Sequence, residues 1–257
     1  MAAAFELQNV TCRFGELLAV DSVSLRVDQG EKIALIGPSG GGKTTLLRAL
    51  NTIRAPQTGT VSVFGNEVSG FSPGQLRQLR SRIAFIPQNL GLVGGLRVIQ
   101  NVILGRGGER GTFRSLRDIL VPTEEDRLAI HSILERVGIE EKLYQRTDRL
   151  SGGQQQRVAI ARALFQGAEA ILADEPVSSV DPARARDTVK LLCELSKERK
   201  FTLCMSLHNL ELAREYFPRI VGLRGGKLIL DAAPEEMGED DLRQLYELSV
   251  EEMMEDA

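Results

Sequence analysis

Residues 37–45, GPSGGGKTT, have the residue types and spacing of a phosphate-binding loop. The stretch fits G-x-x-x-x-G-K-[ST] and lies between a predicted strand, KIALIG, and a helix predicted to begin near Thr44. Glycines let backbone N–H groups turn toward an anion, and the helix adds its positive end. We predict that Lys43 contacts the β- and γ-phosphates of a nucleoside triphosphate and that Thr44 binds Mg²⁺. The predicted nucleotide contacts here are Gly37, Pro38, Ser39, Gly40, Gly41, Gly42, Lys43, Thr44 and Thr45.

The second acidic motif is ILADE, residues 171–175. Its apolar residues predict a buried strand that carries Asp174 to its end, beside the phosphate loop if the sheet is ordered as in other P-loop folds. We predict that Asp174 holds Mg²⁺ through water and that Glu175 orients or deprotonates an attacking water. The alternative for Glu175 is a solvated acid at a strand end.

Two more side chains follow predicted strands. Gln88 comes just after RIAFIP and is a candidate ligand for Mg²⁺ and water. His208 ends FTLCMSL, and ligands of open α/β folds bind at the carboxyl ends of strands. There His208 could contact the γ-phosphate and help to position the water. The alternative for His208 is a structural or merely exposed histidine.

The stretch RLSGGQQQR, residues 149–157, begins a predicted helix with two adjacent glycines. Ser151 can act as the N-cap with Gln154 at the third helical position, which is the pattern of a capping box. Gly152 and Gly153 leave the first N–H groups uncovered, so the helix end can receive an anion. Since the chain already has one phosphate loop, we predict that this end serves a nucleotide held by a second copy, in a two-fold dimer with two composite sites.

Alternating strands and helices must position these residues, and they predict an α/β fold with a mainly parallel sheet covered on both faces. Residues 1–88 form the predicted first part of the nucleotide-binding core, with an antiparallel β subdomain, and residues 150–233 form its second part. Residues 89–149 show no strand pattern and form a predicted helical subdomain. Residues 234–257 form an acidic tail with a short helix.

The composition limits the possible classes of protein. The 257 residues suffice to bury a sizeable core, and the net charge of −3 gives no broad basic field, so nucleic acid is not an expected partner. Three cysteines without CxxC spacing indicate reduced thiols. We find no apolar run of membrane-spanning length, and the first residues are not expected to form a signal peptide, because Glu6 interrupts any apolar stretch. If the protein works at a membrane, another chain is expected to hold it there.

The order of the motifs, GPSGGGKTT, LSGGQ, ILADEP and SSVD, resembles that of the ATP-binding-cassette (ABC) ATPases from about Phe5 to Leu248. The resemblance implies that Phe14 stacks on adenine and that Gln88 lies in the loop that senses a membrane partner. It also implies that residues 178–181, which include Asp181, cross the dimer interface and that His208 is the switch histidine.

Two departures from the family pattern are mild. Phe14 replaces the commoner tyrosine, and Val180 stands where leucine is usual. Neither puts hydrolysis in doubt. The stretches NLGLVGGLRVIQNVILGR, TFRSLRDILVP and DDLRQLYEL look like the ATP-binding subunits of phosphonate importers. This finer resemblance implies a cargo of phosphonate or a related oxyanion such as phosphite.

The resemblance implies an ATPase that uses ATP and Mg²⁺ and forms an ATP-dependent, head-to-tail homodimer. Its expected partners are an integral membrane permease, docked around Gln88 and residues 89–122, and indirectly a periplasmic or extracellular solute-binding protein. The expected location is peripheral, on the cytoplasmic face of the inner membrane. The alternative is a soluble ABC-type ATPase that acts as a switch in a cytosolic phosphonate-degrading or other assembly.

Overall fold

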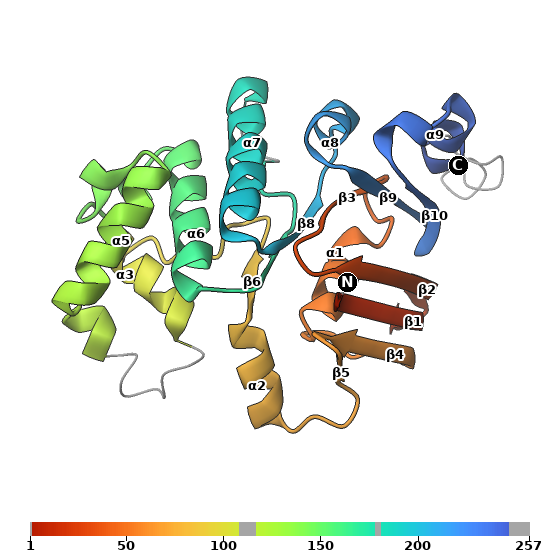
Figure 1. Ribbon diagram of the computed structural model, residues 1–257, viewed down its shortest axis with the longest axis horizontal. Helices are drawn as coiled ribbons and strands as arrows, with labels where there is room; N and C mark the ends of the chain where they lie inside the picture. Colours follow the sequence, from red (N-terminus) through yellow and green to blue (C-terminus); the bar gives the residue numbers. More distant parts are fainter. Residues whose placement is uncertain (1, 108–116, 178–180, 247–257) are drawn as a thin grey trace.

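The computed structural model describes residues 2–107, 117–177 and 181–246, and Figure 1 shows how they are arranged. An antiparallel sheet has the strand order β2-β1-β4-β5, and a second sheet has the order β10-β9-β3-β8-β7-β6. The strands are β1 (Ala3–Phe14), β2 (Leu17–Asp28), β3 (Lys32–Ile36), β4 (Thr58–Val63), β5 (Asn66–Glu67), β6 (Ile83–Ile86), β7 (Ala170–Ala173), β8 (Thr202–Ser206), β9 (Arg219–Arg224) and β10 (Lys227–Ala232).

The second sheet is parallel from β6 to β9, and only β10 pairs antiparallel, in a hairpin with β9. Strands β7 and β8 are buried along their whole length, as expected for parallel strands covered on both faces. The predicted α/β fold, with a mainly parallel sheet and an N-terminal antiparallel part, is confirmed.

Helices cover both faces of the parallel sheet. They are α1 (Lys43–Leu50), α2 (Pro73–Ser81), α3 (Val98–Ile103), α5 (Glu124–Arg136), α6 (Gly152–Gln166), α7 (Pro182–Arg199), α8 (Leu210–Tyr216) and α9 (Glu239–Tyr246). Short 3-10 turns are η1 (Leu104–Arg106), η2 (Glu140–Lys142), η3 (Thr147–Arg149) and η4 (Pro234–Glu236). Helix α1 begins at Lys43, next to the predicted start.

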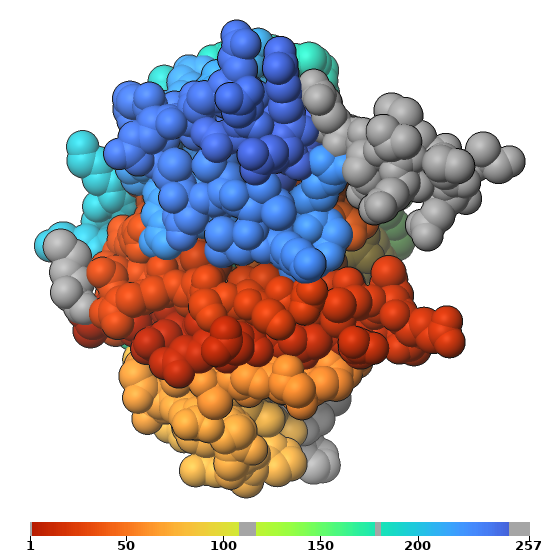
Figure 2. All heavy atoms as spheres, turned by 90° about the vertical axis from the view of Figure 1, so that its right-hand side faces the viewer, coloured from red at the N-terminus to blue at the C-terminus, as the bar shows by residue number. Residues whose placement is uncertain are grey.

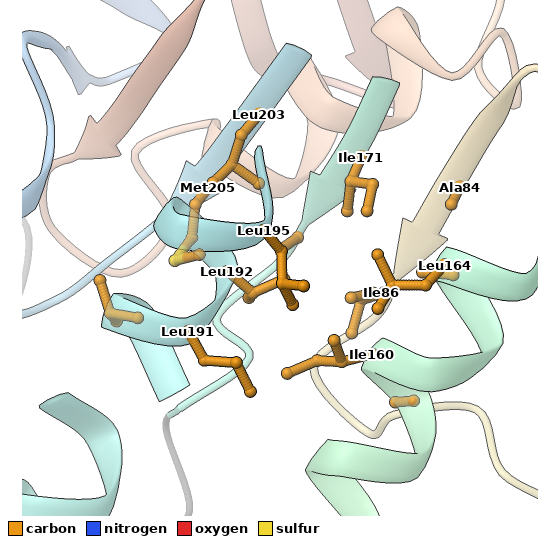
Figure 3. Packing of buried hydrophobic residues seen from close by; sticks show 14 of the residues in the cluster. Ala84, Ile86, Ile160, Leu164, Ile171, Leu191, Leu192, Leu195, Leu203 and Met205 are labelled. Carbon is orange, nitrogen blue, oxygen red and sulfur yellow. The ribbon is translucent and has the colours of Figure 1, made fainter. Parts of the chain in front are cut away.

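Two hydrophobic cores lie on the two faces of the parallel sheet. One encloses α1 between the two sheets and includes Leu46 and Leu50 together with Phe5 of β1 and Leu35 of β3. The other joins the sheet to α7, α6, α3 and α5. In Figure 3 the labelled side chains of α6 and α7 point toward those of β6, β7 and β8. The phosphate-loop helix is therefore fixed between two sheets.

The helices α3, α5 and α6 pack on one another beside this second core. Thr123 caps α5 by accepting the amide proton of Asp126, as its sequence pattern indicates. Asn101 is fully buried, and its side chain bonds to the main chain of Val93 and to the hydroxyl of Thr147. These bonds fasten the segment after β6 to α3. The limits 89–149 for a helical subdomain stay a prediction.

The C-terminal elements lie against the N-terminal strands, as the blue and red surfaces of Figure 2 show. The Asp21 amide donates to the carbonyl of Gly226 (2.8 Å), and Lys227 pairs with Asp21 at 3.7 Å. Arg219 of β9 bonds to Glu31 (2.8 Å). Among the residues that the structure describes, no helix combines the length and the apolar composition needed to cross a membrane.

Candidate active site

The phosphate loop, residues 37–42, connects the central strand β3 to α1 and requires glycine where it touches other backbone. Gly37 has a φ of 138°, and a Cβ there would lie 2.0 Å from the carbonyl oxygen of Leu223. Gly42 has a φ of 104°, and a Cβ there would lie 2.3 Å from the carbonyl oxygen of Ala19. Left-handed backbone and this close packing exclude other residues at both positions.

All predicted residues of the loop lie in this connection or in the first turn of α1, which holds Lys43, Thr44 and Thr45. The Lys43 side chain is buried, and its Nζ donates to the carbonyl oxygens of Gly37 and Pro38, both at 2.9 Å. Nζ also lies 4.0 Å from Oε1 of Glu175. Burial lowers the pKa of Lys43, and Glu175 partly offsets this effect.

Asp174 follows β7 and is buried beside the loop. Its Oδ1 accepts hydrogen bonds from the hydroxyls of Thr44 (3.0 Å) and Ser206 (2.9 Å). Two of the three residues predicted to hold Mg²⁺, Thr44 and Asp174, are thus in direct contact. Their contact depends on the strand order, because β8 alone separates β7 from β3.

Glu175 is the residue around which the other predicted catalytic side chains gather. Its Oε1 lies 2.6 Å from Nε2 of His208, and its Oε2 accepts a hydrogen bond from Nε2 of Gln88 (3.1 Å). Its backbone has a φ of 47°, and its amide donates to Oγ of Ser206 (2.8 Å). The structure therefore brings together Glu175, His208 and Gln88, which follow three neighbouring parallel strands.

Phe14 ends β1 and shares a surface cavity of about 300 Å³ with residues 40–45 of the phosphate loop and with Arg48. Phe14 is 44% exposed, so its ring is accessible to a base. The guanidinium of Arg54 lies 4.3 Å from the ring centroid, and it also donates to the carbonyl of Arg13. Sequence reasoning missed Arg48 and Arg54, since neither follows a recognisable motif.

The N-terminal end of α6 lies by a different cavity of about 270 Å³, which Arg157 and Arg184 also line. Ser151 and Gln154 form the predicted capping box, and Gly152 and Gly153 occupy the first helical positions. Among the described residues, none lines both this cavity and the phosphate-loop cavity.

Asp181 caps α7 by accepting the amide proton of Arg184 (3.1 Å), and the two side chains form an ion pair at 3.2 Å. Its predicted role at a dimer interface needs a second chain. The rest of that motif, residues 178–180 with Val180, lies outside the described residues, as does Leu248.

The donor set fits Mg²⁺ better than a metal held by protein alone. Within the part of the chain that the structure describes, no group of three or more His, Cys, Asp or Glu could hold a metal ion. One hydroxyl and one carboxylate, from Thr44 and Asp174, meet at the phosphate loop. Mg²⁺ at nucleotide sites is commonly held by one or two carboxylates, substrate phosphates and water.

Sequence reasoning also missed Ser206, which touches both Asp174 and Glu175. The one available signal was a hydroxyl at the end of the strand TLCMS, directly after the apolar residues 203–205.

The phosphate loop follows the central parallel strand β3, and two acids follow β7, which only β8 separates from β3. This arrangement defines a P-loop nucleotide-binding ATPase. The ABC transporter family matches residues 20–178, and the chain belongs to this family. The chain is 45% identical to the phosphonates import ATP-binding protein PhnC of Rhizobium johnstonii, over 94% of this chain and 86% of that protein. It is 42% identical to the PhnC protein of Rhodopseudomonas palustris (strain BisB5), over 96% and 91%.

Solved structures share the fold over nearly the whole chain. The chain is similar to cbiO1 of Clostridium perfringens, part of the ABC transporter complex cbiONQ, with a TM-score of 0.80 and 25% identity over 95% of this chain and 94% of that one. It is similar to the cassette MJ0796, solved as a dimer in a post-hydrolysis state with ADP and Pi, with a TM-score of 0.78 and 30% identity over 91% and 100%. The resemblance to ABC ATPases is confirmed.

Proposed function

We propose that this chain is the ATP-hydrolysing subunit of an ABC importer for phosphonates or a related oxyanion such as phosphite. The observation that carries the hydrolytic part is the position of Glu175 between Lys43, His208 and Gln88. The relatives named as phosphonate import proteins support the cargo, since the similarity covers at least 94% of this chain. They do not favour the alternative of a soluble switch.

In the proposed reaction, Lys43 binds the β- and γ-phosphates, and Phe14 stacks on adenine. Thr44 and Asp174, with Gln88, hold Mg²⁺, which neutralises charge on the phosphate oxygens. Glu175 accepts a proton from a water whose oxygen attacks the γ-phosphorus. The bond from that phosphorus to the bridging oxygen of ADP breaks, and ADP and phosphate are released. His208 helps to hold the water and the γ-phosphate.

Each site is completed by a second copy of the chain in this proposal. The helix end at Ser151, Gly152, Gly153 and Gln154 binds the γ-phosphate of a nucleotide held by the phosphate loop of the partner. Two observations support this arrangement. The two motifs line separate cavities within one chain, and the similar cassette MJ0796 was solved as a dimer. Asp181 lies at the proposed interface.

The proposed complex places this protein peripherally on the cytoplasmic face of the inner membrane, bound to an integral permease. A periplasmic or extracellular solute-binding protein would deliver the cargo to that permease. The surface proposed for docking surrounds Gln88 and includes Val93, an exposed apolar residue of the segment that follows.

Affinity purification of the tagged chain from detergent-solubilised membranes of its native host tests this proposal. We expect a polytopic membrane protein to co-purify. With that permease and its binding protein in proteoliposomes, phosphonate or phosphite should stimulate ATP hydrolysis, and sulfate should not. Recovery only with soluble enzymes would contradict the importer and support the switch. A permease complex stimulated by an unrelated solute would contradict the cargo alone.

A further inference from the structure

Ser206, the last residue of β8, connects the two acids of the site through one hydroxyl group. It is fully buried. Its Oγ lies 2.9 Å from Oδ1 of Asp174 and 2.8 Å from the amide nitrogen of Glu175. The amide can only donate, so the hydroxyl accepts there, and its single proton is left for the carboxylate of Asp174. Both hydrogen bonds therefore have a fixed direction.

The first bond orients Asp174. Its Oδ1 accepts from two hydroxyls, Ser206 on β8 and Thr44 on α1, so rotation of the carboxylate is restricted from two sides. Removal of the Ser206 hydroxyl would leave Thr44 as the one hydroxyl on that oxygen. Thr44 is itself a proposed ligand of Mg²⁺, and metal ligands depend on such supporting bonds for their orientation.

The second bond orients Glu175. Its φ of 47° is uncommon for a residue with a side chain and persists only where surrounding contacts hold it. The Ser206 hydroxyl accepts the amide proton of this residue. The resulting backbone direction brings the carboxylate to His208, two residues beyond Ser206 on the same strand end.

We propose that Ser206 is a positioning residue for ATP hydrolysis, whose hydroxyl fixes the orientation of the Asp174 carboxylate and of the Glu175 backbone. The inference rests on the roles proposed above for Asp174 and Glu175. In this inference Ser206 acts through these two residues and is assigned no contact with the reacting atoms.

The test compares Ser206→Ala, which removes the hydroxyl, with Ser206→Thr, which keeps it. We expect Ser206→Ala to lower kcat about 10- to 100-fold, as for loss of a hydrogen bond to a charged group, while the KM for ATP changes less than about threefold. Ser206→Thr should keep kcat within about threefold of the original protein. With a non-hydrolysable ATP analogue, Mn²⁺ titration followed by electron paramagnetic resonance should show weaker binding only in Ser206→Ala.

Thr202→Val is the matched control for loss of a buried hydroxyl. Thr202 begins the same strand, is fully buried, and its Oγ1 accepts the Gly30 amide proton (3.0 Å) far from the acids. Its kcat and Mn²⁺ binding should equal those of the original protein, although its Tm should fall. If Ser206→Ala behaved like this control, with a lower Tm but unchanged kcat and Mn²⁺ binding, the inference would be overturned. A folded Ser206→Thr as slow as Ser206→Ala would overturn it too.

Glu175→Gln, measured in parallel, separates this inference from the proposed function. Rapid hydrolysis by Glu175→Gln would show that Glu175 is not the proton acceptor and would contradict the proposed mechanism. A slow Glu175→Gln together with a fully active Ser206→Ala would leave the mechanism standing and overturn only the role of Ser206.

Discussion

Glu175 contacts side chains that follow β6 and β8 and lies near Lys43 at the start of α1, although its own strand is β7. Glu175→Gln keeps the shape of the side chain and removes its capacity to take a proton. We expect kcat to fall about 10²- to 10⁴-fold and an ATP-bound dimer to accumulate. Phosphate release and size-exclusion chromatography with ATP measure the two effects.

The control for this substitution is Glu169→Gln. Glu169 directly precedes the same strand, β7, and pairs with Arg82, which directly precedes β6. This ion pair therefore lies at the amino ends of the parallel strands, whereas Glu175 lies at their carboxyl ends. Its loss should leave kcat unchanged. Turnover by Glu175→Gln at the original rate would show that another group accepts the proton.

Lys43→Ala removes the buried cation of the phosphate loop. We expect nucleotide affinity to fall about 10- to 100-fold, since hydrogen bonds to charged groups contribute about 1.5–3 kcal/mol. Fluorescence titration with a labelled ATP analogue measures the affinity. Lys32→Ala, at the other end of β3, serves as the control and should bind normally. Equal affinity of both variants would argue against phosphate contact by Lys43.

At the scale of single residues, the sequence predicted those candidate site residues that lie in motifs. The structure places several of them in contact with one another. Asp174, Glu175 and His208 lie at the same end of the sheet because each comes after one of its parallel strands, and this rule can be applied to the sequence alone. Ser206 escaped prediction because its bonds to residues 174 and 175 depend on the register of β7 against β8. A lone serine in an apolar strand carries no sign of that register.

Among the elements, the N-terminal cap of α6 was predicted from the sequence and is confirmed. The caps of α5, α6 and α7 follow local rules that connect a side chain with an amide three residues later. Helices α2 and α8 were missed because both are short and α2 is mostly polar. The capping box of Ser72 and Gln75 was a visible signal for α2, and Asn209 was one for α8.

Complementation between variants tests whether α6 completes a site in a partner chain. Lys43→Ala chains damage the phosphate loop, and Ser151→Arg chains block the helix end. Neither variant alone should hydrolyse ATP well. A mixed dimer pairs two intact halves at one site, so ATP hydrolysis by the mixture should exceed that of each variant alone.

Ser72→Arg controls for the loss of a cap, because Ser72 forms the same capping box on α2. It should cost about 1 kcal/mol of stability and leave hydrolysis intact. The mixture could show no gain in ATP hydrolysis even though mixed dimers bind nucleotide at the intact site. This result would refute the idea that each composite site hydrolyses ATP independently of the other.

For the molecule as a whole, the reactivity of the three thiols measures how well the core excludes solvent. The three cysteines, Cys12, Cys193 and Cys204, are free and buried. Burial raises the pKa of Cys193 to about 11, and it raises the pKa of Cys204 as well. The thiolate fraction at pH 8 is therefore very small. We expect a thiol-specific dye to label none of them in the native protein and all three in guanidinium chloride; rapid native labelling would contradict this burial.

The fold class followed from the order of motifs and from the alternation of strands and helices. The strand order β10-β9-β3-β8-β7-β6 did not, because it joins segments far apart in the chain. Propensity and periodicity describe neighbours along the sequence, and pairings such as β6 with β7, across the whole helical segment, lie beyond their reach.

The bonds around the two acids also govern how the sheet can open. The Asp174 amide donates to the carbonyl of Ile86 (2.8 Å), the Glu175 amide to Ser206, and the Leu207 amide to the carbonyl of Leu35 (2.9 Å). Fraying of one strand end would therefore break the contacts that orient the proposed catalytic groups. Amide hydrogen–deuterium exchange at these three positions should proceed as one cooperative event, and bound ATP should slow it by mass action. In this molecule the proposed catalytic arrangement and local protection against unfolding would thus depend on the same hydrogen bonds.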